Sequence, residues 1–456
     1  MEQSKGRRVI LFPLPFQGHI NSMLELANVL HSRGFSITII HTRFNSLNPS
    51  TLNPHFTYHS IPVDFSETEA ASRDPKGFFY LLNVRCIEPF RECLARLLSD
   101  DVKLEGPVAC LISDTLLHFT RPIAESFKLP RILLDVSCAT NFAVLAVFPL
   151  LKEKGYLPIQ DSRLEEVITE LSPIKVKDLP KAPGSDPENY YQLAIQVSNE
   201  PKSSYGLILN TFEDLEGHAL ARIRQEHLPN VPIFPTGPFH KCCRTISSSS
   251  SLLAQDQSCI SWLNTQAPKS VVYVSFGSII QIEEAQFLEI AWGLANSNQP
   301  FLWVVRPGLV NGLDWLEALP NGFLEALNGR AYIVKWAPQK EVLAHLAVGA
   351  FWTHNGWNST MESICEGVPM ICTPGYIEQM LIARNVSDVW KVGLQLEHGI
   401  ERGEVERTIR RLMVEKEGEE IKERSLKLME KANRCLKEGG SSYQSLDGLA
   451  KHILSL

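Results

Sequence analysis

Residues 336–379 read WAPQKEVLAHLAVGAFWTHNGWNSTMESICEGVPMICTPGYIEQ, and this stretch decides the fold of the chain. Within it, residues 350–354 form a short apolar run with β-branched and aromatic side chains, which predicts a buried strand. Asn355 and Gly356 follow as a tight turn, and residues 357–366 have the pattern of a helix. A strand that ends in a glycine turn and opens a helix leaves backbone N–H groups facing a crevice. The stretch therefore predicts an α/β fold with an anion site at this helix start.

Polar side chains surround the predicted helix start. Small hydroxyl and amide groups there would let a phosphate approach and would donate to it: Asn358, Ser359 and Thr360. His354 adds a further donor, Glu362 could accept both hydroxyls of a ribose, and Trp336 offers a flat apolar face to a base. Each feature alone is more often ordinary helix capping or core packing. Together they suit a nucleoside diphosphate.

Length and composition restrict the class of protein. The chain has 456 residues, enough for two domains, and a formal net charge of −7 argues against a nucleic-acid partner. No apolar run reaches the roughly 18 residues of a membrane span, and residues 1–8 lack the apolar core of a signal peptide. The ten cysteines show no metal-ligand spacing. We expect a cytoplasmic protein with reduced thiols and without a membrane span.

The first half of the chain has the pattern of a parallel α/β domain. Residues 8–12 predict a strand, residues 20–32 a helix that ends at Gly34, and residues 35–41 a second strand. Such a βαβ unit implies a parallel sheet. An amphipathic pattern over residues 77–98 predicts one helix. Further strands are expected at residues 56–62, 108–113, 131–135 and 206–210.

A small, polar, serine-rich stretch near mid-chain marks the expected domain boundary. We place an N-terminal domain over residues 1–240, a linker over residues 241–262 and a C-terminal domain over residues 263–456. The same stretch could instead be a surface loop within one domain. The second domain repeats the α/β pattern, with strands at residues 270–276, 301–305 and 331–334 before the opening stretch.

Two titratable residues follow strands of the first half. His19 comes just after the first strand, and Asp114 ends the strand at residues 108–113. Because the carboxyl ends of parallel strands share one edge of a sheet, both side chains can face the same crevice. An imidazole takes a proton from a hydroxyl near neutral pH, and a carboxylate on its other nitrogen fixes the tautomer. The pair could instead be a polar helix start and an N-cap residue.

The stretch at residues 336–379 resembles the signature box of the plant UDP-dependent glycosyltransferases that modify small molecules. The likeness lies in the opening WAPQ, the central H-x-G-W-N-S-x-x-E, the EGVP and the closing acidic residue with Gln. The segment FQGHIN and the segment CLISD at residues 110–114 are similar to the catalytic segments of that family. The resemblance implies a GT-B fold, two facing Rossmann-like domains, with the last helix packing back on the N-terminal domain. It also implies an inverting displacement at the anomeric carbon that yields a β-glycoside.

The resemblance assigns roles to individual residues. His19 is the general base and Asp114 its orienting partner, while the uracil, ribose, diphosphate and sugar are held mainly by the C-terminal domain. The implied donor-binding residues are Ser137, Ser278, Trp336, Ala337, Gln339, His354, Trp357, Asn358, Ser359, Glu362, Tyr376, Glu378 and Gln379. No D-x-D and no G-x-G occurs in the chain, so we expect neither a metal nor a nicotinamide cofactor, and the UDP-sugar is a co-substrate.

One position departs from the family pattern, because Glu378 stands where the box usually has Asp. A carboxylate longer by one methylene moves its oxygens, so a UDP-sugar other than UDP-glucose remains open. The sequence also leaves open a UDP-sugar-binding protein without transfer activity and a sugar-nucleotide epimerase.

The acceptor pocket is expected in the N-terminal half, where aromatic residues are frequent and charges are few. Its candidates, each of which could instead be core, are Phe16, Phe78, Phe79, Tyr80, Leu117, His118, Phe119, Asn141, Phe142 and Tyr190. The N-terminal segments look closest to a subgroup that includes the steviol-glycoside and benzoxazinone glucosyltransferases. We expect a monomer that acts on a small apolar plant molecule: a phenolic, a terpenoid or terpenoid glycoside, a benzoxazinoid or a hormone.

Overall fold

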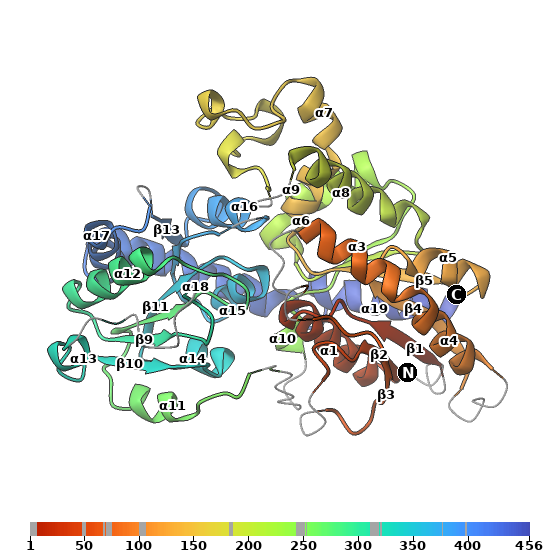
Figure 1. Ribbon diagram of the computed structural model, residues 1–456, viewed down its shortest axis with the longest axis horizontal. Helices are drawn as coiled ribbons and strands as arrows, with labels where there is room; N and C mark the ends of the chain where they lie inside the picture. The colour runs from red at the N-terminus through yellow and green to blue at the C-terminus, as the bar shows by residue number, and fades with distance from the viewer. Residues whose placement is uncertain are drawn as a thin grey trace. The chain divides into compact units, whose positions relative to one another are not determined.

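The computed structural model describes residues 7–47, 52–66, 69, 75–99, 106–181, 186–242, 251, 253–310, 319, 322–375, 377–396 and 399–456 (Figure 1). The chain forms two compact units. The first comprises Met1–Glu166, Lys181–Leu252 and Arg434–Leu456, and the second comprises Val167–Pro180 and Leu253–Asn433. Among the described helices, none combines the length and the apolar character needed to cross a membrane.

The first unit is built on a seven-stranded sheet with the order β3-β2-β1-β4-β5-β6-β7. Every pairing of neighbours in this sheet is parallel. Its strands are β1 (Arg8–Phe12), β2 (Ser36–Thr42), β3 (Thr57–Ile61), β4 (Val108–Asp114), β5 (Arg131–Asp135), β6 (Leu207–Leu209) and β7 (Ile233–Pro235). Its helices are α1 (Gln17–Ser32), α3 (Pro75–Arg85), α4 (Ile87–Leu98), α5 (Thr120–Ser126), α6 (Ala139–Ala146), α7 (Phe148–Glu153), α8 (Pro187–Asn199), α9 (Glu213–Arg222), α10 (Phe239–Cys242) and α19 (Ser441–Ser455).

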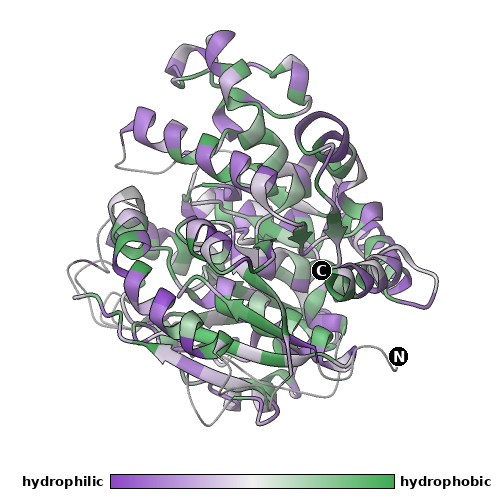
Figure 2. Ribbon diagram, turned by 90° about the vertical axis from the view of Figure 1, so that its right-hand side faces the viewer, coloured by the Kyte–Doolittle hydropathy of each residue, from purple (hydrophilic) through white to green (hydrophobic). Residues whose placement is uncertain are grey.

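Both faces of this sheet are covered, which explains why β1 is apolar from Val9 to Phe12. Val9 and Leu11 belong to one hydrophobic cluster, whereas Ile10 and Phe12 belong to another. Alternate residues of a strand point to opposite faces, so the middle of a strand between two helical layers favours apolar side chains at every position. Figure 2 shows the result as green, hydrophobic strands among helices that carry purple, hydrophilic residues.

The last helix belongs to the first unit (Figure 1). Leu449 and Ile453 of α19 join the same cluster as Val9 and Leu11. The Ser442 hydroxyl donates to the carbonyl oxygen of Gly237, which ties the start of α19 to the segment after β7. The C-terminal residues of the chain are therefore part of the N-terminal sheet domain.

The second unit has a six-stranded sheet with the order β10-β9-β8-β11-β12-β13, and its neighbours also pair in parallel. Its strands are β8 (Val271–Ser275), β9 (Phe301–Val304), β10 (Ala331–Val334), β11 (Val348–Thr353), β12 (Met370–Cys372) and β13 (Gly393–Gln395). Its helices are α11 (Ser258–Leu263), α12 (Glu284–Asn296), α13 (Phe323–Ala326), α14 (Gln339–Ala344), α15 (Trp357–Cys365), α16 (Gln379–Arg384) and α17 (Arg402–Met413). Helix α18 (Lys416–Cys435) carries the chain back to the first unit.

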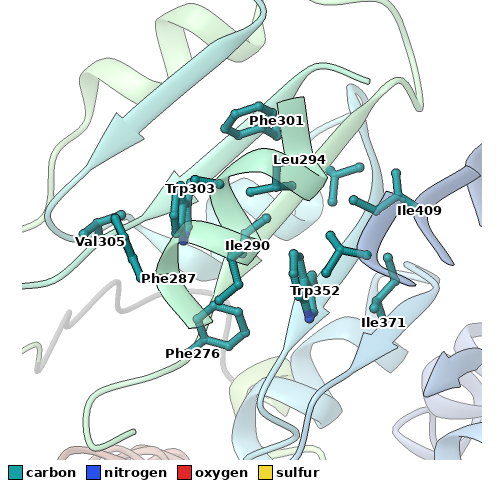
Figure 3. Packing of buried hydrophobic residues seen from close by; sticks show 14 of the residues in the cluster. Phe276, Phe287, Ile290, Leu294, Phe301, Trp303, Val305, Trp352, Ile371 and Ile409 are labelled. Atoms are coloured by element: carbon teal, nitrogen blue, oxygen red, sulfur yellow. The ribbon is translucent and has the colours of Figure 1, made fainter. Parts of the chain in front are cut away.

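Aromatic packing holds the core of the second unit together (Figure 3). The ring of Trp303 on β9 stacks on Phe287 of α12, with 4.8 Å between the ring centroids. Trp352 on β11 meets Phe276 edge to face, and its indole N–H donates to Thr373 at 2.8 Å. Two parallel, doubly covered sheets confirm the expectation of two Rossmann-like domains.

The structure differs from the expected boundaries in three places. The predicted helix at 77–98 is two helices, because Pro89 stands in the first turn of α4, where a missing N–H costs nothing. Residues 258–262, placed in the linker, lie in α11, while residues 243–250 and 252 lie outside the described residues. Residues 167–180 belong to the second unit, although their position in the chain placed them in the N-terminal domain.

Candidate functional site

The structure brings His19 and Asp114 together in the first unit. His19 lies in the first turn of α1, and Asp114 is the last residue of β4, the strand that pairs with β1. The His19 Nδ1 atom is 2.6 Å from Asp114 Oδ2, and the Leu116 N–H donates to Oδ1 at 3.0 Å. The carboxylate is held through both oxygens and is 1% exposed, whereas the imidazole is 23% exposed. With Nδ1–H donating to Asp114, Nε2 is the basic nitrogen of the ring.

An aromatic wall lies beside the imidazole. The ring centroid of Phe16, which immediately precedes α1, is 6.5 Å from that of His19. Phe78 and Phe79 of α3 pack on Phe16 at 5.4 and 6.3 Å. Phe16 and Phe79 are partly exposed and Phe78 is buried, so two of the three rings are open to a ligand. Such a surface suits an apolar group next to the base.

A second set of polar residues lies at the start of α15 in the second unit. After β11, Asn355 takes a left-handed conformation with φ of 62°, and α15 begins at Trp357. The Asn355 N–H donates to Thr353 Oγ1 and its amide nitrogen contacts Cys372 Sγ, which fixes the turn. Asn tolerates this conformation better than most residues, so the turn needs no glycine here. The first-turn N–H groups of α15, with Asn358 and Ser359, present hydrogen-bond donors at a helix start, where proteins commonly bind anions.

His354 is held in this region by two glycines. A Cβ atom at Gly277 would lie 2.5 Å from His354 Cε1, and one at Gly356 would lie 2.6 Å from Nε2. Only glycine therefore leaves room for the ring at both positions. Desolvation lowers the pKa of His354 to about 4, so the ring is neutral at neutral pH. A neutral imidazole can donate one hydrogen bond to an oxyanion without carrying charge. Ser278 is exposed and follows Gly277 directly.

A buried hydrogen-bond network orients Glu362. The Gln339 amide nitrogen donates to Glu362 Oε2 at 2.7 Å and to Ser359 Oγ at 2.9 Å. The Tyr273 hydroxyl donates to the Gln339 amide oxygen at 3.3 Å, which sets the direction of the amide. Nothing in the sequence pattern pointed to Tyr273, because it lies in β8, far from Gln339 along the chain. Trp336 is partly exposed and Ala337 is buried, at the turn that precedes α14.

The residues expected at the sugar lie where α16 begins. Gln379 is its first residue and Glu378 its N-cap, and the Gly375 N–H donates to Gln379 Oε1 at 2.9 Å. Ile377 takes φ of 59°, which is unfavourable for a β-branched residue. The rings of Trp357 and Trp390 lie 6.3 Å apart, and Trp357 is buried. Tyr376 lies outside the described residues.

Comparison with known proteins agrees with this geometry. Residues 210–428 match the family described as UDP-glucoronosyl and UDP-glucosyl transferase. The chain is 50% identical to UDP-glycosyltransferase 76B1 of Arabidopsis thaliana over 100% of both chains. It is 41% identical to the flavonol 3-O-glucosyltransferase UGT76E12 of the same plant, over 100% of this chain and 99% of that one. The chain belongs to the plant UDP-glycosyltransferases.

A solved structure of Phytolacca americana UGT2 complexed with UDP-2fluoro-glucose and pterostilbene resembles this UDP-glycosyltransferase along its whole length. The TM-score is 0.81 at 27% identity, covering 98% of this chain and 99% of that one. The fold is therefore GT-B, as the sequence predicts.

Several other expected acceptor residues of this UDP-glycosyltransferase have surroundings unlike those of Phe16 and Phe79. Leu117 and Phe142 are fully buried in hydrophobic clusters. His118 and Phe119 border a hollow of 280 Å³ whose other lining residues are Arg121, Pro122, Gln196, Asn199 and Glu200. That lining is part polar and part apolar and shares no residue with the wall of Phe16 and Phe79. Tyr190 packs on Phe148, and Tyr80 is 65% exposed.

Ser137 and Asn141 present buried oxygens at the start of α6. Neither Ser137 Oγ nor Asn141 Oδ1 has a hydrogen-bond partner among the described residues. An unsatisfied buried oxygen requires an explanation, and a bound ligand supplies one. Glu216 fixes this region by accepting from the Ala139 and Thr140 N–H groups at 2.9 Å. Sequence reasoning missed Glu216 because it lies on α9, a distant part of the chain.

No metal site is evident in the part of the chain that the structure describes, since no three His, Cys, Asp or Glu side chains gather there.

Substituting Gly277→Ala should weaken UDP binding about 10-fold or more. The new methyl group would collide with the His354 ring, and alanine at φ of 71° adds strain of about 1 kcal/mol. Gly329→Ala is the matched control, because Gly329 has φ of 79° but nothing within 4 Å of the added Cβ. Isothermal titration calorimetry with UDP measures the loss of affinity in each of the two variants. Equal losses in both variants would show that backbone strain and not the His354 contact is responsible.

Substituting Tyr273→Phe should weaken UDP binding roughly 3- to 10-fold, the value of one neutral hydrogen bond. The change removes the hydroxyl, which donates to Gln339 and also interacts with Ser275, so the amide can turn away from Glu362. Tyr332→Phe is the control, because its hydroxyl donates to Ser258 Oγ on the surface of the same unit. An unchanged dissociation constant for UDP in Tyr273→Phe would exclude this role.

Proposed function

We propose that this UDP-glycosyltransferase transfers glucose from UDP-glucose to a hydroxyl of a small apolar plant molecule, with inversion at the anomeric carbon. The observation that carries the proposal is the 2.6 Å contact between His19 and Asp114, with the aromatic wall of Phe16 and Phe79 beside it. A base in an apolar setting suits the deprotonation of a weakly acidic hydroxyl.

In the proposed reaction His19 Nε2 takes the proton of the acceptor hydroxyl. The acceptor oxygen then bonds to the anomeric carbon from the face opposite the diphosphate, and the bond from that carbon to the diphosphate oxygen breaks. The leaving UDP takes the electron pair and one additional negative charge. The Asp114 carboxylate stabilises the imidazolium, and the N–H groups at the start of α15 with neutral His354 stabilise the leaving group. Attack from the opposite face turns an α-linked donor into a β-glycoside.

The residues around Gln339 support a uridine-linked donor. Glu362 is 8% exposed and already held by Gln339, so its carboxylate is oriented before a ribose hydroxyl donates to it. Trp336 and Ala337 would hold the uracil, and Gln379 with Glu378 the sugar hydroxyls. A relative named as a flavonol 3-O-glucosyltransferase and a similar structure holding UDP-2fluoro-glucose favour glucose and a small phenolic acceptor.

Donor choice is tested by initial rates with UDP-glucose, UDP-galactose, UDP-xylose and UDP-glucuronate. We expect the highest initial rate with UDP-glucose. Glu378→Asp should change the order of the rates with the four donors and have little effect on the dissociation constant of UDP, because the carboxylate moves by one methylene. UDP-glucose as the slowest donor in the native enzyme would overturn the proposed donor.

Acceptor class is tested by mass spectrometry of reactions with phenolic, terpenoid, terpenoid-glycoside, benzoxazinoid and hormone acceptors. Proton NMR of the product should show a β-anomeric linkage, and rates should be unchanged by EDTA since we propose a metal-free reaction. Without acceptor, UDP-glucose should be recovered unchanged. Conversion to another UDP-sugar under those conditions would support an epimerase instead.

A further inference from the structure

A buried ion pair connects α16 to a segment far away in the sequence. Arg384 is the last residue of α16, and its guanidinium donates to Asp178 through Nε at 2.8 Å and Nη2 at 3.1 Å. Arg384 is 8% exposed and Asp178 is 3% exposed. The remaining guanidinium nitrogen donates to Asp388, whose side chain is 44% exposed. The contact with Asp178 is bidentate, which fixes the orientation of the guanidinium as well as its distance.

Asp178 belongs to the 167–180 segment, which is a folded part of the second unit. The bridge between Val167 and Lys175 closes this segment, and the Ile168 N–H donates to the Ile174 carbonyl at 2.9 Å. Asp178 Oδ2 also accepts from the Lys175 N–H at 2.9 Å. The apolar side chains of the 167–180 segment include Ile168, Val176 and Leu179, which are fully buried. The carboxylate is therefore held in place before it meets Arg384.

Helix α16 needs such support because it is short. It has six residues and continues directly into the π-helical turn Asn385–Val389, and a helical run of that length is not stable by itself in water, so tertiary contacts set its position. Buried Leu381, Ile382 and Ala383 pack its middle, and the bidentate pair holds its end. Its first residue is Gln379, which follows the left-handed Ile377 and is held by the Gly375 N–H. Helix α16 thus connects the Asp178 contact at Arg384 to Gln379, the side chain expected at the sugar.

We propose that Asp178 is a positioning residue of the sugar subsite. Through Arg384 it fixes α16 and thereby the place of the Gln379 amide against the sugar hydroxyls. The inference rests on the proposed function, in which Gln379 contacts the transferred sugar. The residues that we assign to uridine belong to a separate network, in which Gln339 of α14 and Glu362 of α15 are joined by Tyr273 of β8. Loss of the Asp178 contact therefore weakens the sugar part of donor recognition and spares the UDP part.

The substitution Asp178→Asn tests the proposal, because it keeps the shape of the side chain and removes its charge. We expect KM for UDP-glucose to rise about 10-fold, since small misplacements of binding groups cost that much or more. The dissociation constant of UDP should change less than about twofold, and Asp178→Glu should restore part of the lost affinity. Asp388→Asn is the matched control, because it removes the exposed partner of the same guanidinium, and it should leave both values unchanged.

If the ion pair were merely structural, Asp178→Asn would lower thermal stability and would either weaken the binding of UDP and UDP-glucose equally or weaken the binding of neither. Either result overturns the proposal. Where Asp178→Asn fails to fold, Arg384→Lys takes its place, since it keeps the charge and loses the bidentate geometry. Gln379→Ala separates this inference from the proposed function. If Gln379→Ala leaves KM for UDP-glucose unchanged, the sugar subsite itself is misassigned. If that variant loses sugar affinity while Asp178→Asn does not, only the positioning role is wrong.

Discussion

Replacing His19 with alanine is expected to lower kcat about 10³-fold, within the range of general base catalysis. In the described part of the chain His19 is the basic side chain that pairs with Asp114, so the variant loses the group that takes the acceptor proton. UDP binding, which we assign to the second unit, should be retained within about twofold by calorimetry. Loss of turnover with intact UDP binding would separate a catalytic defect from a donor-binding defect.

The substitution His19→Gln is the sharper form of this test. Alanine leaves the buried Asp114 carboxylate with one partner fewer, whereas the glutamine amide can still donate to it and has no basic nitrogen. Both variants should therefore be inactive, with Gln the more stable in thermal unfolding. His218→Gln serves as the control, because His218 is an exposed residue of α9 in the same unit. Substantial turnover in His19→Gln would refute the base assignment.

The substitution Asp114→Asn is expected to be nearly as damaging, with kcat reduced about 10³- to 10⁴-fold. The reason lies in the Leu116 N–H, which donates to Oδ1. In the variant this N–H keeps the amide oxygen on its side, so the amide NH₂ faces His19 Nδ1. Nδ1 must then accept, the proton moves to Nε2, and the ring presents a donor where a base is required.

The position of the ring proton of His19 in Asp114→Asn can be measured separately from the rate. Kinetics of Asp114→Asn should show a loss of kcat without a matching rise in KM for UDP-glucose, and ring nitrogen NMR shifts should report the proton on Nε2. Asp447→Asn is the control, since it removes an exposed carboxylate that pairs with Arg33 in the same unit. A variant with native kcat would show that Asp114 neither orients nor stabilises the ring.

Much of the second unit follows from the sequence because its determinants are local. The strand, the Asn355–Gly356 turn and the start of α15 lie within a few residues of one another, and each is set by side-chain pattern and turn chemistry. The meeting of His19 with Asp114 was also predictable, because both follow neighbouring parallel strands whose ends share an edge. For the same reason the family resemblance and the physical interpretation agree on these residues.

The acceptor region was less predictable. Phe16, Phe119 and Phe142 look alike in the sequence, yet Phe16 is partly exposed beside His19, Phe119 borders a hollow of mixed lining and Phe142 is core. Periodicity places a residue on a face of its own helix or strand. It does not say which other element covers that face, since this depends on packing between distant segments.

The sequence by itself determined two parallel α/β domains, the strand–turn–helix at the start of α15 and the pairing of His19 with Asp114. Only the tertiary structure decided the contacts between residues that no local pattern relates: Glu216 with the start of α6, Tyr273 with Gln339, and Asp178 with Arg384. The physical reason is that each of these contacts requires a buried polar group to find its partner across the chain. Which partner a buried polar group meets depends on three-dimensional packing, so it cannot be predicted from a hydrophobic pattern.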